Sequence, residues 1–228
     1  MLIGGLQKVT LIDYPKKIAA TIFVQGCPFR CHYCHNSELV LPDLFKTPIA
    51  EEEILKFLKD KVGKLDGVVI SGGEPTCQSD LSDFIKKVKA LGFLVKIDTS
   101  GINPQVLASL LELKFIDYIA MDLKAPIKKY FNVIGKEVDL KKIEESINII
   151  LKSGIPHEFR TTIVDGLHSI EDILEMARLI KNADLYVLQK FNPKSTINPI
   201  YMHKKSFTNS TLEECKKEIE KFVPCQIR

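Results

Sequence analysis

Short apolar segments rich in β-branched residues alternate with helical segments along most of this chain. The apolar runs are bounded by turn residues, as is typical of buried strands, and lie at 18–24, 67–71, 93–98, 116–122, 158–164 and 185–191. Apolar residues at helical spacing predict helices at 51–62, 81–91, 104–113, 140–152, 170–181 and 212–222, and 125–138 is expected to be irregular. Six strands separated by helices predict an α/β fold with a parallel sheet or barrel and right-handed crossovers.

Polar motifs follow nearly all of these strands. Folds of this kind gather their chemistry in the loops at the carboxyl ends of the strands. A cysteine-rich loop follows the first strand, and the motifs at 72–75, 98–101 and 121–124 end the next three. Residues 160–162 lie in the fifth strand, and 189–193 end the sixth. We therefore expect these segments to meet at one rim of the sheet.

Three cysteines, Cys27, Cys31 and Cys34, form a C-x3-C-x2-C pattern in the first of these loops. A [4Fe–4S] cluster normally takes four thiolates, so three ligands would leave one iron open to bind and reduce a small molecule. A zinc site with His32 or His35 as fourth ligand is the main alternative. Structural zinc usually recruits a second ligand pair about 12–20 residues on, which this chain lacks. The pattern at 31–35 also fits c-type haem attachment, which needs export, and no signal peptide is predicted.

Composition and charge restrict the classes of partner. The 32 basic and 29 acidic residues give a net charge of +3, too balanced to predict binding to nucleic acid or to a membrane surface. No apolar run approaches the roughly 18 residues of a membrane span. Six cysteines in 228 residues are no disulfide framework, and they favour a reducing, cytoplasmic location. The length predicts one domain, 1–228, with a core at about 15–195 and a helical extension at about 208–228.

The cysteine pattern with Tyr33 before its last cysteine, followed after the next strand by Gly-Gly-Glu-Pro at 72–75, resembles the radical S-adenosylmethionine (SAM) superfamily. The resemblance covers about residues 5–195 and implies a partial (β/α)6 TIM-like barrel, in agreement with the six strands counted above. It implies one [4Fe–4S] cluster on Cys27, Cys31 and Cys34, with SAM bound to the open iron. Members of the superfamily cleave SAM with one electron and use the 5′-deoxyadenosyl radical to abstract a hydrogen atom.

Several further residues are expected to bind SAM by this resemblance. Gly72 and Gly73 lack side chains and would let the backbone approach the methionine part closely, although Gly-Gly-Glu-Pro alone also suits an ordinary turn. Glu74 would accept a hydrogen bond from the SAM ammonium group or would hold the turn. The adenine and ribose contacts are expected from Tyr33, His35 and Ser100, with a plain loop histidine as the alternative for His35.

Charged residues complete the predicted site. Asp98 and Asp122 end adjacent strands, and two carboxylates so close need a cation, for which oxygen ligands favour Na⁺, K⁺ or an ammonium group. Lys124 supplies a positive charge at the same rim or is a surface lysine. Arg160, in an apolar strand, is expected to pair with a carboxylate of SAM or of the barrel. Asn192 either contacts the cofactor or caps the loop after the sixth strand.

The segments 4–15, 25–36, 98–101 and 121–124 resemble the activating enzymes of glycyl radical enzymes, most closely those of the anaerobic ribonucleoside-triphosphate reductase. This implies removal of an α-hydrogen from one glycine of a large partner enzyme, with flavodoxin or ferredoxin as the reductant. Lys16 and Lys17 depart from the pattern, since many relatives carry glycine there. Cys77, Cys215 and Cys225 do not reproduce the four-cysteine motif of a second cluster.

Two other functions are open at this point. A radical SAM enzyme could act on a small molecule, such as a deazapurine precursor in tRNA modification, and would then need no partner protein. A metal-binding electron-transfer module would explain the cysteines, but it would leave the polar residues at the other strand ends unexplained.

Overall fold

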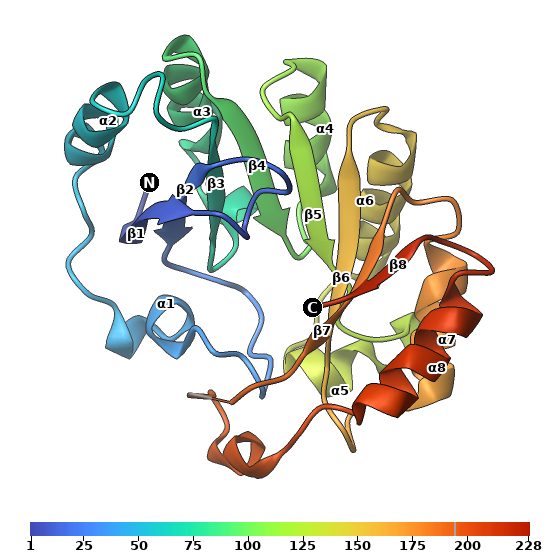
Figure 1. The fold of residues 1–228 in the computed structure, drawn as a ribbon. Helices are drawn as coiled ribbons and strands as arrows, with labels where there is room; N and C mark the ends of the chain where they lie inside the picture. Colours follow the sequence, from blue (N-terminus) through green and yellow to red (C-terminus); the bar gives the residue numbers. More distant parts are fainter. Residues whose placement is uncertain (194) are drawn as a thin grey trace.

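An eight-stranded sheet whose strands follow one another in chain order organises the fold, seen here in a computed structural model that describes residues 1–193 and 195–228 (Figure 1). β1 runs antiparallel to β2, and every later pair of neighbours is parallel. The strands are β1 Ile3–Thr10, β2 Ala19–Val24, β3 Gly67–Gly72, β4 Leu94–Thr99, β5 Tyr118–Asp122, β6 His157–Ile163, β7 Tyr186–Lys190 and β8 Cys225–Ile227.

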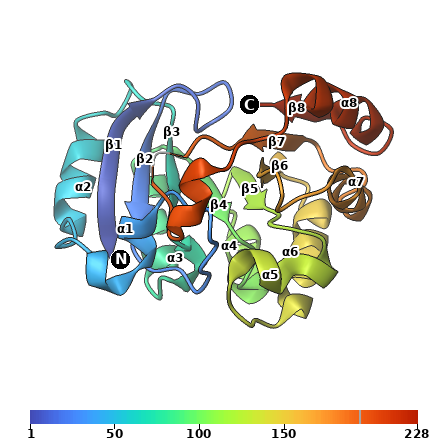
Figure 2. The same cartoon turned by 90° about the horizontal axis from the view of Figure 1, so that it is seen from below.

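The sheet curls without closing, because β1 and β8 are its edges and do not pair with each other in the described part of the chain. Most of the helices lie along its outer side (Figure 2). The predicted α/β fold with a partial parallel barrel is confirmed, and β2–β7 are the six predicted strands. The helices are α1 Ser37–Val40, α2 Glu51–Lys59, α3 Leu81–Ala90, α4 Pro104–Glu112, α5 Tyr130–Ile134, α6 Leu140–Lys152, α7 Ile170–Leu179 and α8 Asn209–Ile219.

The two faces of the central strands bury different residues. On the outer face, Val68 and Ile70 of β3 join the large apolar core that also contains Phe84 and Val88 of α3. Full burial of each such side chain contributes about 1.5–3 kcal/mol. On the inner face a small apolar cluster forms around Val69, and nearer the carboxyl ends of the strands the inner face becomes polar. The barrel therefore has an apolar base and a polar rim.

Both edge strands were absent from the sequence prediction. β1 contains two glycines and exposes three of its residues, so it shows no continuous apolar run; pairing with β2 defines it. The extension at 208–228 was expected to be helical, but after α8 its last residues form β8, parallel to β7. Three residues are too few to carry a strand pattern. Within the irregular stretch expected at 125–138, the structure has the short helix α5.

The turn between β1 and β2 has one strained position. Lys16 adopts a φ of 60°, in the left-handed region that favours glycine. A glycine would adopt this conformation without the steric cost that a lysine side chain has there. Among the described residues, no helix combines the length and the apolar character that crossing a membrane requires.

Candidate active site

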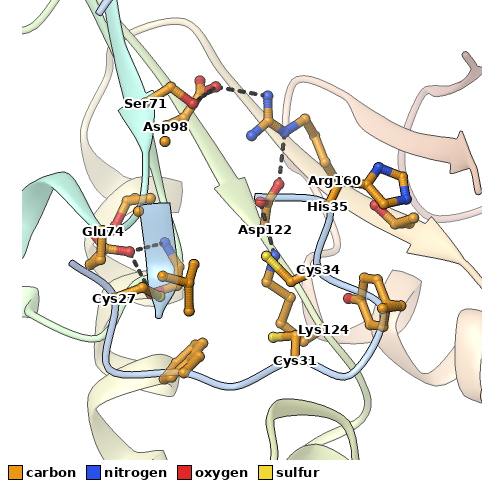
Figure 3. Close-up of a pocket in the computed structure, with 18 residues that line it drawn as sticks. Cys27, Cys31, Cys34, His35, Ser71, Glu74, Asp98, Asp122, Lys124 and Arg160 are labelled. Carbon is orange, nitrogen blue, oxygen red and sulfur yellow. Dashed lines mark hydrogen bonds and ion pairs between the residues drawn. The ribbon is translucent and has the colours of Figure 1, made fainter. Parts of the chain in front are cut away.

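A cavity of about 160 Å³ lies at the carboxyl ends of the parallel strands (Figure 3). Nearly all of the predicted site residues line it: Cys27, Cys31, Tyr33, Cys34, His35, Gly72, Gly73, Glu74, Asp98, Ser100, Asp122, Lys124 and Arg160. Its wall also includes residues that were not predicted, namely Phe29, Val40, Ser71, Thr99 and Thr162. Asn192 is exposed and does not line the cavity, so the structure does not bring it to the other residues.

The cysteine loop is braced by its own side chains and by α5. The guanidinium group of Arg30 donates to the carbonyl oxygens of Cys27 and Phe29, at 2.6 and 2.7 Å. The backbone amide of Arg30 donates to the carbonyl of Ile134 at 2.7 Å. Cys31 is buried, and Cys27 and Cys34 are half-buried. The loop therefore presents three thiols from a fixed backbone to one cavity.

The environment of the thiols fits an iron–sulfur cluster. Burial raises the pKa of Cys27 and of Cys34, and it raises the pKa of Cys31 to about 11. Ionising buried thiols of this kind needs a strong positive charge, which a cluster supplies on binding. The other three cysteines, Cys77, Cys215 and Cys225, do not line the cavity, so its wall offers three thiolates.

The zinc alternative needs His32 or His35 as a fourth ligand beside the cysteines. Among the described residues, no group of three His, Cys, Asp or Glu side chains is arranged to hold a metal ion, which bears on the zinc and cluster alternatives alike. The two histidines considered as a fourth ligand are stacked on aromatic rings. His32 stacks on Tyr201 with ring centroids 5.9 Å apart, and His35 stacks on Phe191 at 5.1 Å.

Gly72 and Gly73 lie against the backbone that leads into the cysteine loop. The amide of Gly73 donates to the carbonyl of Val24 at 2.8 Å, and the amide of Glu74 donates to that of Gly26 at 2.7 Å. A Cβ on Gly73 would lie 2.2 Å from the Gly26 carbonyl oxygen, and one on Gly72, whose φ is 106°, would lie 2.7 Å from the Val24 nitrogen. Both glycines are thus required because the Gly-Gly-Glu-Pro loop lies directly against the backbone that leads into the cysteine loop.

Glu74 is 1% exposed and has the hydrogen bonds expected of a residue that holds the turn. One carboxylate oxygen accepts from the amide and hydroxyl of Thr76 and from the hydroxyl of Thr99, at 3.1, 2.6 and 2.7 Å. The other accepts from the amide and the hydroxyl of Ser100. Residues of the chain itself thus supply five hydrogen-bond donors to the Glu74 carboxylate. Glu74 therefore links the end of β3 to the end of β4.

Charged side chains from three strands form a connected network on the inner face of the sheet. Nε of Arg160 lies 2.8 Å from Asp122, and Nη1 lies 3.2 Å from Asp98 (Figure 3). Lys124 pairs with Asp122 at 3.0 Å, and Lys96 pairs with Asp98. Burial alone would raise the pKa of both carboxyl groups, but Arg160 and the paired lysines hold it below the usual value. Side chains thus supply positive charge to both carboxylates, and the ammonium groups of Lys96 and Lys124 are part of it. A monovalent cation beside the two carboxylates stays a prediction.

Lys96 was missed in the sequence analysis, although it carried a signal. It is a charged residue inside the apolar run at 93–98, two positions before Asp98. Residues two apart in a strand point to the same face. A lysine spaced in this way from a carboxylate at a strand end can be recognised as its internal partner.

Residues 195–198 lie against the cysteine loop, which no periodic pattern could have predicted. The amides of Ile197 and Asn198 donate to the carbonyls of Cys34 and His32, at 3.2 and 3.0 Å. The hydroxyl of Ser195 donates to the carbonyl of His35 at 2.9 Å. The segment therefore holds the backbone on both sides of the last cysteine.

Known proteins resemble this chain in both sequence and fold. Residues 21–180 match the radical SAM superfamily. A protein of Methanocaldococcus jannaschii, provisionally named as a glycyl-radical enzyme activating enzyme, is 36% identical over 97% of this chain and 93% of its own length. The pyruvate formate-lyase-activating enzyme of Clostridium pasteurianum is 33% identical over 79% of this chain and 76% of its own.

A solved structure shares the fold at low sequence identity. Streptococcus suis SuiB bound to S-adenosylmethionine superposes with a TM-score of 0.71 and 16% identity, over 90% of this chain. The match covers 48% of the SuiB chain, so this chain spans about half of that protein. The superfamily implies a [4Fe–4S] cluster and SAM, for which the three thiols of this cavity provide a fitting donor set. The chain belongs to the radical SAM superfamily and, with its two relatives, to the family of glycyl-radical enzyme activating enzymes.

Proposed function

We propose that this protein removes an α-hydrogen from one glycine of a partner enzyme, with a [4Fe–4S] cluster held by Cys27, Cys31 and Cys34. The observation that carries the proposal is the cavity that joins these thiols to the polar ends of the neighbouring strands. When bound, the cluster and SAM supply a one-electron cleavage that yields methionine and, after a hydrogen atom has been taken from the glycine, 5′-deoxyadenosine. The glycine retains the unpaired electron.

The residues of this chain hold and orient the reactants. The loop braced by Arg30 fixes the three thiols, and Gly72 and Gly73 allow the next loop to lie directly against it. Three cationic side chains face two carboxylates in the inner network, which leaves a surplus positive charge. We assign this surplus, through Lys124 and Arg160, to the carboxylate of SAM.

The partner is proposed to be an anaerobic ribonucleoside-triphosphate reductase, with flavodoxin or ferredoxin as the electron donor. The support for this finer assignment is the resemblance of the segments 4–15, 25–36, 98–101 and 121–124 to activating enzymes of that reductase. A protein substrate also needs a route to the cavity. In the part of the chain that the structure describes, the edge strands β1 and β8 do not pair with each other, and this open sheet is compatible with such a route.

The test is anaerobic reconstitution with iron and sulfide, followed by dithionite and SAM. We expect release of 5′-deoxyadenosine and methionine, and a glycyl doublet in electron paramagnetic resonance when the reductase is added. Cys31→Ser is expected to abolish both signals. Cys77→Ser is the matched control, because this cysteine is exposed and lies outside the cavity, and it should retain both.

Each other outcome identifies a different function. A chain that binds only zinc, or a cluster that does not respond to SAM, would make the protein a metal-binding module. Cleavage of SAM without a doublet on any glycyl radical enzyme would favour a small-molecule substrate. A doublet on pyruvate formate-lyase but not on the reductase would reject the reductase as the partner, and it would leave the activation of a glycyl radical enzyme as the function.

A further inference from the structure

Lys96 on β4 is a fully buried charged side chain on the inner face of the barrel. Its exposed fraction is 0%, and its ammonium group forms an ion pair with Asp98. The strand neighbours at its level are Val69 of β3 and Tyr118 of β5, and the ammonium lies 5.8 Å from the centre of the Tyr118 ring. Lys96 thus sits at the boundary between the apolar base and the polar rim.

A lysine in such a place opposes folding unless its charge has a use. Taking an ammonium group out of water is strongly unfavourable, and attraction to one carboxylate offsets this only in part. Methionine would fill a similar volume with no charge to desolvate. The position therefore calls for an explanation in terms of the charge itself.

The surroundings of Asp98 provide that explanation. Asp98 shares the guanidinium of Arg160 with Asp122, and the distance to Asp98, 3.2 Å, is the longer of the two. Asp122 has a second cationic partner in Lys124. Without Lys96, Asp98 would keep its share of Arg160 and the hydrogen bond from the Ser71 hydroxyl at 2.9 Å, but it would have no cation of its own. This 12% exposed carboxylate would then need a second cation.

We propose that Lys96 is a built-in counter-ion, whose ammonium group takes the place that a monovalent metal ion would otherwise fill beside Asp98. The active site then requires neither Na⁺ nor K⁺. Lys96 is a positioning residue: it holds Asp98, and through Asp98 it holds Arg160 at the cavity wall. The part of this inference that concerns SAM binding rests on the proposed function.

The test compares cluster-loaded protein in Na⁺, K⁺ and tetramethylammonium chloride at equal ionic strength. Tetramethylammonium is too large to enter a site beside Asp98. For the wild type we expect the same thermal midpoint and the same SAM affinity in all three salts. Lys96→Met should bind SAM about tenfold more weakly in tetramethylammonium, and Na⁺ or K⁺ should restore most of that loss.

A matched control uses another lysine of the same chain. Lys89 pairs with Asp117 at 2.7 Å, and both side chains are 27% exposed, outside the cavity. Lys89→Met should show no specific response to the metal ions in either measurement. A general effect of losing one positive charge would appear in both variants.

A double variant tests whether the two charges act as a pair. If Lys96 serves to neutralise Asp98, Lys96→Met with Asp98→Asn should unfold at a higher temperature than Lys96→Met alone. If Lys96→Met does not fold, Lys96→Arg keeps a cation and should bind SAM equally in all three salts.

Three results would overturn the inference. They are a wild type whose SAM affinity falls about tenfold without Na⁺ and K⁺, a Lys96→Met protein that equals the wild type in every salt, and a double variant no more stable than the single one. The unfolding measurements need no SAM. If the wild type fails to cleave SAM, the proposed function is rejected. The unfolding measurements still decide whether Lys96 neutralises Asp98.

Discussion

The carboxylate of Glu74 accepts two hydrogen bonds from Ser100, at 2.7 Å from the backbone amide and 2.5 Å from the hydroxyl. Glu74 follows β3 and Ser100 follows β4, so one buried side chain closes the loops of two neighbouring strands. The loop that Glu74 holds is also the loop whose glycines lie against the cysteine segment. The acidic residue of the Gly-Gly-Glu-Pro motif thereby organises the site from within the protein.

Glu74→Gln is expected to lower the free energy of unfolding by about 2–4 kcal/mol. The amide nitrogen of glutamine would face N–H or O–H donors where a carboxylate oxygen now accepts, so buried donors would lose their partner. Chemical denaturation monitored by circular dichroism measures the change. Glu171→Gln is the control, since Glu171 pairs with Arg178 at the surface, and it should change stability by less than about 1 kcal/mol. Equal effects of the two substitutions would refute this account of Glu74.

Gly73→Ala is expected to reduce the iron bound per chain after reconstitution. Its new Cβ would lie 2.2 Å from the carbonyl oxygen of Gly26, and backbone cannot yield there without moving the cysteine loop. Gly5→Ala is the matched control, because a Cβ at that glycine would lie 3.6 Å from the Phe23 side chain, an ordinary contact. The iron content, the sulfide content and the thermal midpoint are measured for both variants and compared. Full cluster content in Gly73→Ala would show that the two loops can separate.

The inner strands could be predicted from the sequence because they are buried on both faces. Ile70 and Val69 point to opposite sides of β3 and are both at 0% exposure, which produces the continuous apolar run. The edge strands lack this signal: β1 is defined by its pairing to β2, and β8 has only three residues. Burial on two faces is thus visible in a sequence, whereas pairing at an edge is not.

The residues of the site were predictable in kind, and their partners were not. Position at a strand end identified Asp98 and Asp122, because parallel strands bring their carboxyl ends together. A charge inside an apolar strand identified Arg160. Which charge meets which on different strands depends on strand register and side-chain reach. The sharing of Arg160 between Asp98 and Asp122 and the five donors around Glu74 therefore required coordinates. Asn192, chosen only because it follows a strand, lies outside the cavity.

Tyr33→Phe is expected to raise the thermal stability of the cluster-free protein by about 1 kcal/mol. The Tyr33 hydroxyl is buried and has no hydrogen-bond partner among the described residues, and leaving such a group unsatisfied opposes folding. Because Tyr33 lines the cavity, we expect the stabilisation added by the cluster and SAM to be smaller in the variant than in the wild type.

Tyr186→Phe serves as the control for this substitution. The Tyr186 hydroxyl is also buried, but it lies 2.8 Å from the hydroxyl of Thr161, so its removal should lower stability by about 1 kcal/mol. Differential scanning fluorimetry of the wild type and both variants under anaerobic conditions, before and after loading, gives the values to compare. A Tyr33→Phe protein that loses as much stability as Tyr186→Phe would mean that the Tyr33 hydroxyl already has a partner.

The imidazole of His168 is held in its neutral form by two backbone groups. The amide of Val164 donates to Nδ1 at 3.2 Å, so Nδ1 is unprotonated and Nε2 donates to the carbonyl of Lys124 at 2.9 Å. Burial lowers the pKa of His168 below its usual value. Asp172 and Lys129 are the charged groups that act on it, and their effects oppose each other.

Stability should therefore decrease as the pH falls below about 6.5. In the unfolded chain His168 takes up a proton near pH 6.5, whereas in the folded protein it does not until a lower pH, so acid favours the unfolded state. The free energy of unfolding should fall by up to about 1.4 kcal/mol per pH unit in this window, and it should be restored as the pH rises above it. His168→Asn keeps an acceptor for the Val164 amide and cannot take up the proton. Urea unfolding of the cluster-loaded wild type and variant across this window gives the difference between them, from which other titrating groups cancel. Parallel pH profiles for the two proteins would mean that His168 is protonated alike in the folded and unfolded chains.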